Sequence, residues 1–113
     1  MAKSENKNTS IARLKAIQKA LEDSGHQRRI AEVGMEVVSL LLRKNSDYGN
    51  SAFKKPVLSP GTQPSDAILV RMSDKISRLN NLKDGKGAKV EESIRDTMTD
   101  LAGYAILWLV ATD

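Results

Sequence analysis

The stretch that decides the fold is VEESIRDTMTDLAGYAILWLVA, residues 90–111. In its first half, apolar side chains such as Ile94, Met98 and Leu101 recur at helical spacing on one side. Acidic and small polar residues line the other side, and Glu92 lies in the first turn, where a carboxylate complements the helix dipole. The pattern predicts a long helix over this segment.

The second half of this segment, residues 101–110, is apolar nearly all round. A helix of this kind must be covered on every face, which a chain of 113 residues can hardly do alone. We therefore expect a homo-oligomer in which the apolar C-terminal helix forms a subunit interface. The apolar run is about half the length of a membrane span, so a membrane is not an expected partner.

Upstream, apolar side chains at helical spacing predict three further helices, over residues 9–21, 27–44 and 62 or 65 to 82. The connection over 45–65 holds all three prolines and is longer than is usual in a compact domain. Because it carries two of the four aromatic residues, we expect it to be ordered. The polar residues 1–8 are expected to form a disordered arm. The fold class is therefore all-α, a four-helix bundle-like single domain over 9–113 with one long ordered loop.

Composition removes several classes of site. The chain has no cysteine, which excludes disulfides, zinc–thiolate sites and thiol catalysis, and its single histidine, His26, excludes a site that needs two imidazoles. The net charge of +4 comes mostly from residues 1–15. Because the remaining charge is nearly balanced, nucleic acid is not the expected partner. The opening lacks the apolar segment of a signal peptide, which indicates a cytoplasmic protein.

Acidic residues recur at spacings of four on two of the predicted helices: Glu32 and Glu36 on one, and Glu92 and Asp96 on the other, with Asp100 a turn further on. If the two helices pack antiparallel, these carboxylates face one cleft. Mg²⁺ prefers oxygen ligands and substrate phosphates, and a metal-bound water can attack a phosphorus atom. We expect these five residues as Mg²⁺ ligands, with Glu36 and Asp96 as the catalytic pair. The alternative is that the acids pair with arginine and lysine side chains of neighbouring helices.

Basic residues form a line on the third predicted helix, where Arg71, Lys75 and Arg78 are spaced by four and three. Together with Lys44 they are candidates for phosphate binding. The alternative is an ordinary solvated face. In the loop, Tyr48 and Phe53 are candidates for stacking on a base or ring, or for plugging the edge of the core.

The run KNSDYGNS, residues 44–51, resembles the signature of a small helical family found in phages, the nucleotide-modification-associated domain 1 family. The runs ILVRMSDKISRL (68–79) and ESIRDTMTDLAGY (92–104) resemble its other two blocks, so the resemblance covers about residues 28–110. It implies that Asp47 and Asp74 are alternative ligands in place of Glu32. It also implies that Tyr48 and Asn50 contact a base.

Members of that family are similar in outline to the MazG-like all-α nucleoside triphosphate pyrophosphohydrolases. Those enzymes place paired acids from two helices around Mg²⁺ and release pyrophosphate. The resemblance implies that Glu32 and Glu36 match the first acidic pair, and Glu92 and Asp96 the second. Here both pairs are spaced by four, whereas the MazG pattern spaces them by three, and the stretch between the pairs is longer.

Three functions follow as hypotheses. The first is Mg²⁺-dependent hydrolysis of a nucleoside triphosphate or related nucleotide, in the host-cell cytoplasm if the chain is encoded by a phage. The second is a non-catalytic nucleotide sponge that sequesters a phosphorylated or cyclic nucleotide signal. The third is a nucleic-acid accessory protein that uses the basic arm. A nucleotide ligand is favoured over nucleic acid because the charge outside the arm is nearly balanced.

Overall fold

The computed structural model describes residues 7–113, and within that range it is built from helices alone. They are α1 (Lys7–Glu22), α2 (His26–Asp47), the short 3-10 helix η1 (Ser51–Phe53), α3 (Pro64–Leu82) and α4 (Ala88–Ala111). The all-α class and the four helices predicted from the sequence are confirmed, with small shifts at the helix ends. Helix α1 begins at Lys7, inside the expected arm, and the rest of that arm lies outside the described residues.

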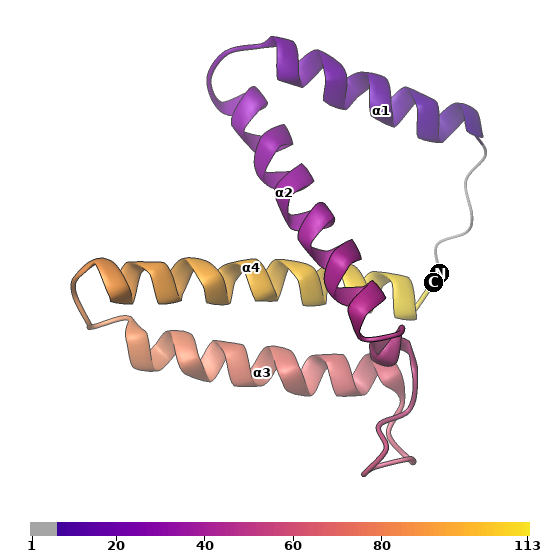
Figure 1. Ribbon diagram of the computed structural model, residues 1–113, viewed down its shortest axis with the longest axis vertical. Coiled ribbons are helices and arrows are strands. Elements are labelled where there is room, and N and C mark those ends of the chain that lie inside the picture. The colour runs from indigo at the N-terminus through magenta and orange to yellow at the C-terminus, as the bar shows by residue number, and fades with distance from the viewer. Residues whose placement is uncertain (1–6) are drawn as a thin grey trace.

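Helices α3 and α4 form an antiparallel hairpin and make the most extensive helix–helix contact of the described chain. Figure 1 shows them side by side. Ile68 of α3 is buried, with 1% exposure. Thr97 of α4 is also buried, and its hydroxyl donates a hydrogen bond to the Ser93 carbonyl at 2.7 Å, so burial leaves no polar atom unpaired. Pro64 in the first turn of α3 fixes where this hairpin begins.

Helix α2 crosses α4 near the C-terminal part of α4 instead of running along it (Figure 1). Gly103 is buried at this crossing, and a Cβ added there would lie 3.4 Å from Leu41 Cδ1. Such a distance is an ordinary van der Waals contact, so α2 and α4 pack against each other at this point. The crossing brings the last turns of α2 and the following η1 helix to the start of α3, which η1 contacts.

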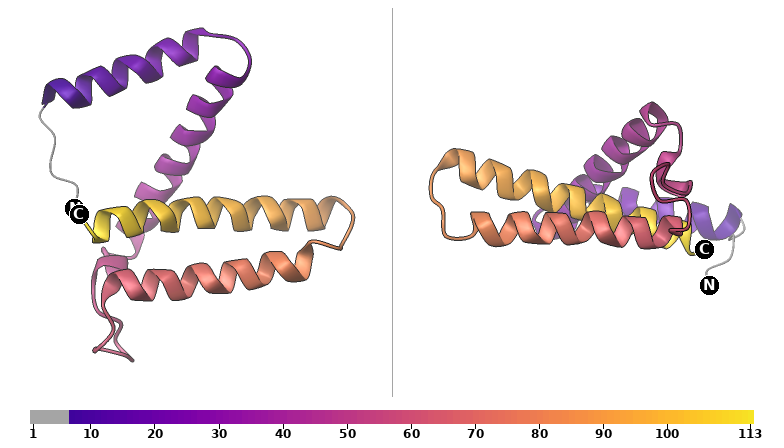
Figure 2. Two further views of the ribbon diagram at one scale, coloured as in Figure 1. Left: turned by 180° about the vertical axis from the view of Figure 1, so that it is seen from behind. Right: turned by 90° about the horizontal axis from the view of Figure 1, so that it is seen from below.

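Helix α1 folds back from α2 and diverges from it, as both views in Figure 2 show. It contacts α2, but none of its residues is buried. Within one chain, α3, α4 and the C-terminal half of α2 come together, while the α1–α2 hairpin extends away from them (Figure 1).

The second half of α4 is only partly covered by the described chain. Leu101, Leu107 and Trp108 are half-buried, whereas Leu109 and Val110 are each a little over half exposed. None of the helices among residues 7–113 is both long enough and apolar enough to cross a membrane.

Candidate functional site

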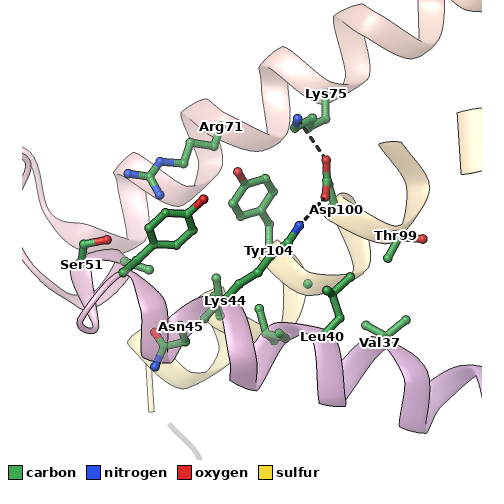
Figure 3. Close-up of a pocket in the computed structure, with 15 residues that line it drawn as sticks. Val37, Leu40, Lys44, Asn45, Ser51, Arg71, Lys75, Thr99, Asp100 and Tyr104 are labelled. Carbon is green, nitrogen blue, oxygen red and sulfur yellow. Dashed lines mark ion pairs between the residues drawn. The ribbon is translucent and has the colours of Figure 1, made fainter. Parts of the chain in front are cut away.

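A pocket of about 290 Å³ lies where α2 crosses the α3–α4 hairpin (Figure 3). Its apolar lining comes from α2, η1 and α4, and its polar lining comes from all three helices, η1 and the turn between α2 and η1. The apolar part consists of Val37, Leu40, Leu41, Ala52, Gly103 and Leu107. The polar part consists of Lys44, Asn45, Tyr48, Ser51, Arg71, Lys75, Thr99, Asp100 and Tyr104.

A second, more open hollow of about 630 Å³ adjoins the first and shares five lining residues with it. It adds Asp74 and Arg78 of α3. Together the two hollows are lined by four cationic side chains and two acidic ones. The combined site therefore carries net positive charge, which attracts anions.

Asp100 organises the cations of the inner pocket. Its two carboxylate oxygens lie 3.6 Å from Lys44 Nζ and 3.1 Å from Lys75 Nζ. The three residues come from three different helices, so this carboxylate ties α2, α3 and α4 together at the pocket wall (Figure 3). The Asp100 side chain is 29% exposed, which leaves it reachable by solvent and by a ligand.

Arg71 is the strongest anion-binding candidate. It has no ion-pair partner among residues 7–113, unlike the two lysines. Figure 3 shows its guanidinium group and the hydroxyls of Ser51 and Tyr104 around the same space. A guanidinium presents several N–H donors in a rigid fork that matches the oxygens of a phosphate. Arg78, further along α3, lines the outer hollow and likewise has no ion-pair partner in the described part of the chain.

The run Tyr48-Gly49-Asn50 forms the turn that follows α2, and the geometry of this turn accounts for its residue types. Gly49 and Asn50 have φ angles of 58° and 63°, both left-handed, a conformation that favours glycine and asparagine. The Asn45 side-chain amide donates a hydrogen bond to Asn50 Oδ1 at 2.6 Å and closes the turn. This geometry ends α2 and starts η1, which places Tyr48 and Ser51 in the pocket lining.

Replacing Gly49 with alanine is expected to lower the free energy of unfolding by about 1 kcal/mol, because an L side chain is strained at a left-handed φ. Chemical denaturation measures this change. Gly61 is the matched control, since its φ is not left-handed and an added Cβ would meet nothing within 4 Å. Equal effects of the two alanines would show that the left-handed turn does not contribute to stability.

The structure brings together the four residues that were predicted to bind phosphate. Lys44, Arg71 and Lys75 line the inner pocket, and Arg78 lines the outer hollow. Of the predicted base or ligand contacts, Tyr48 lines both hollows and Asp74 lines the outer one.

The other predicted ligand contacts line neither hollow. Asn50 instead shapes the turn, and Asp47 is exposed at the end of α2. Phe53 is half-buried in η1, which packs against α3. This position matches the alternative in which Phe53 plugs the edge of the core.

The predicted metal ligands are not gathered in one chain. Across residues 7–113, no group of three acidic or histidine side chains is close enough to hold a metal ion. Glu32 faces Arg28 at 3.8 Å and Arg29 at 3.3 Å on its own helix. Glu36, Glu92 and Asp96 are exposed and line neither hollow. The remaining acid, Asp100, is held by the two lysines.

The cause is the crossing of α2 over α4. The metal hypothesis required antiparallel packing along the length of the two helices, which the structure does not show (Figure 1). The acids at positions 32 and 36 lie in the N-terminal half of α2, whereas the crossing involves its C-terminal half. Within residues 7–113 of a single chain, these acids therefore do not gather around one point.

Sequence reasoning missed several polar residues of the pocket. They are Asn45, Ser51, Thr99 and Tyr104. All four lie inside the runs 44–51 and 92–104, at positions where no chemistry was assigned. Membership in those runs was the only signal in the sequence.

Comparison with known proteins covers this same region. The sequence profile of the family described as nucleotide modification associated domain 1 matches residues 44–111, more than half of the chain. The match spans every polar residue that lines the pocket. No curated protein and no solved structure matches the chain.

Proposed function

The chain belongs to the nucleotide modification associated domain 1 family, and we propose that it binds a phosphorylated nucleotide in the pocket between α2, α3 and α4. The observation that carries this proposal is the arrangement around Arg71. Its guanidinium group lies unpaired within residues 7–113, beside two tyrosines and above an apolar wall, in a site of net positive charge.

The two hollows suit the two chemical halves of a nucleotide. The inner pocket has apolar walls, two tyrosines and a volume at the small end of the range for ligand pockets. It therefore suits a base or a base with its sugar. The outer hollow adds Arg78 to Arg71 and Lys75, three cations on one face of α3. It therefore suits the phosphates, which the cations bind through charge-assisted hydrogen bonds.

Polar groups near the inner pocket supply donors and acceptors for the base or sugar. The Asp100 carboxylate accepts, the Asn45 amide both donates and accepts, and the Ser51 hydroxyl does both. Buried polar groups that a wrong ligand leaves unpaired weaken its binding, so these residues are expected to select among nucleotides.

Binding without turnover, the sponge hypothesis, needs only groups that the pocket of one chain holds. Mg²⁺-dependent hydrolysis needs acidic ligands in addition. Hydrolysis stays a proposal for an assembly in which a second chain supplies the acidic ligands.

The test is titration calorimetry with a panel of nucleoside mono-, di- and triphosphates and cyclic dinucleotides, run with Mg²⁺ and with a chelator. We expect at least one of these ligands to bind in both conditions, because cationic side chains contact the phosphates. A panel with no binder in either condition contradicts the proposal.

Replacing Asp96 with asparagine separates binding from hydrolysis. We expect unchanged nucleotide affinity, since Asp96 is exposed and lines neither hollow. Calorimetry measures the affinity and a phosphate-release assay measures turnover. Release of pyrophosphate that requires both Mg²⁺ and Asp96 would establish hydrolysis instead of simple sequestration.

We propose further that the protein is a cytoplasmic homo-oligomer, as the sequence predicts. The exposed Leu109 and Val110 at the end of α4 support contact with another chain there. The larger unpaired apolar surface lies elsewhere, on α1 and α2.

A further inference from the structure

The described chain exposes much more surface than a folded monomer of its size. Its solvent-accessible area is 8823 Å², whereas a compact 12.4 kDa protein exposes about 6,100 Å². Its radius of gyration is 16.7 Å, against about 13 Å for a compact domain of this length. The excess of about 2,700 Å² is on the order of what one chain contributes to the largest obligate interfaces.

The core of one chain is correspondingly small. Among residues 7–113, only Ile68, Thr97 and Gly103 are fully buried. Folding must offset a conformational entropy cost of about 1–2 kcal/mol per residue, chiefly through apolar burial. Surface from another molecule must therefore complete the core.

The α1–α2 hairpin carries the largest share of the exposed apolar side chains. On α1, Ile11, Leu14 and Ile17 recur every three residues and are 47%, 60% and 39% exposed. On α2, Ile30 and Val33 are 67% and 39% exposed. Most of the stability of a helix in a protein comes from packing of its apolar face, so the stripe on α1 needs a covering surface.

Among residues 7–113, no element covers this stripe. Helix α1 diverges from α2 (Figures 1 and 2).

We propose that α1 and the N-terminal half of α2 form a twofold interface with the same hairpin of a second copy of the chain. A twofold interface is self-complementary, so the exposed apolar side of the hairpin packs against the same side of the hairpin in the second copy.

The first test is the mass of the full-length chain, measured by light scattering after size-exclusion chromatography. We expect twice the chain mass or an even multiple of it. Leu14→Glu and Ile30→Glu each place a charge in the interface and are expected to raise the dissociation constant of the dimer at least tenfold. Leu58→Glu is the control, because Leu58 lies in the loop with 98% exposure, and it should remain a dimer.

A second measurement tests the proposed interface even if those variants fail to fold. Wild-type chains with labelled isoleucine methyl groups are mixed with unlabelled chains, and contacts between chains are recorded by isotope-filtered nuclear magnetic resonance. We expect intermolecular signals from Ile11, Ile17 and Ile30, and none from Ile68, which is buried within its own chain.

Three results would overturn the proposal. They are a monomeric wild-type chain, a dimer that is unaffected by both glutamate variants, and intermolecular signals confined to Ile106 of α4. The last result would move the interface to the C-terminal helix. None of these results bears on nucleotide binding, which is measured separately.

Discussion

Replacing Arg71 with glutamate should lower the affinity for the bound nucleotide by about 100-fold or more. The variant removes the one guanidinium of the inner pocket, which has no ion-pair partner among residues 7–113. It also places a carboxylate where the phosphates are expected, so repulsion adds to the lost hydrogen bonds. Titration calorimetry with the tightest ligand of the nucleotide panel measures the change.

Two further variants make this prediction specific. Arg43→Glu makes the same charge change on an exposed position of α2 that lines neither hollow, and its affinity should stay within about twofold. Arg71→Lys keeps the charge but loses the forked donors, so an intermediate loss is expected. Equal losses in Arg43→Glu and Arg71→Glu would mean that overall charge, and not this pocket, controls binding.

Replacing Ile68 with alanine should lower the free energy of unfolding by about 2–5 kcal/mol. Ile68 is 1% exposed, and it is the one large side chain fully buried among the described residues. The truncation leaves a cavity in the core of the chain. Few other buried side chains are available to relax into that cavity. Chemical denaturation at fixed protein concentration measures the loss, since association also contributes to stability.

Ile76 provides the matched control on the same helix. It is 49% exposed, and its replacement by alanine should cost less than about 1 kcal/mol. If the two alanine variants are equally destabilised, Ile68 is not the centre of the core and the packing of α3 on α4 is different. If Ile68→Ala shows no loss at all, the same conclusion follows.

Most of the fold could be predicted because the sequence pattern of a helix depends on residues close together in the chain. The apolar spacing of residues 90–111 and the prolines of the long connection mark helix and loop within a few residues of the observed ends. The angle at which α2 crosses α4 depends on packing between distant parts of the chain, such as Leu41 near Gly103. Hydrophobic periodicity carries no information about such an angle.

The phosphate-binding side of the site could be predicted for a similar reason. Arg71, Lys75 and Arg78 share a face through helix geometry alone, and the structure places all three in the two hollows. The prediction of the acidic metal ligands depended instead on how two separate helices pack against each other. The positions of Glu36 and Asp96 in the structure show how that assumption fails when the helices cross.

Asp100 illustrates the limit most clearly. In the sequence it continues an acidic line and resembles a metal ligand. In the structure its carboxylate lies between Lys44 and Lys75, which come from two other helices. No spacing rule within one helix indicates such partners, because ion pairs between helices depend on tertiary packing.

The central claim, that this pocket holds a phosphorylated nucleotide, is tested most directly by mass spectrometry of small molecules that co-purify with the folded protein. The wild-type chain is expected to carry a species with a nucleobase and at least one phosphate. The Arg71→Glu variant, purified in parallel, is expected to carry none. A wild-type protein without any such species, or the same species in equal amount on both proteins, would contradict the account.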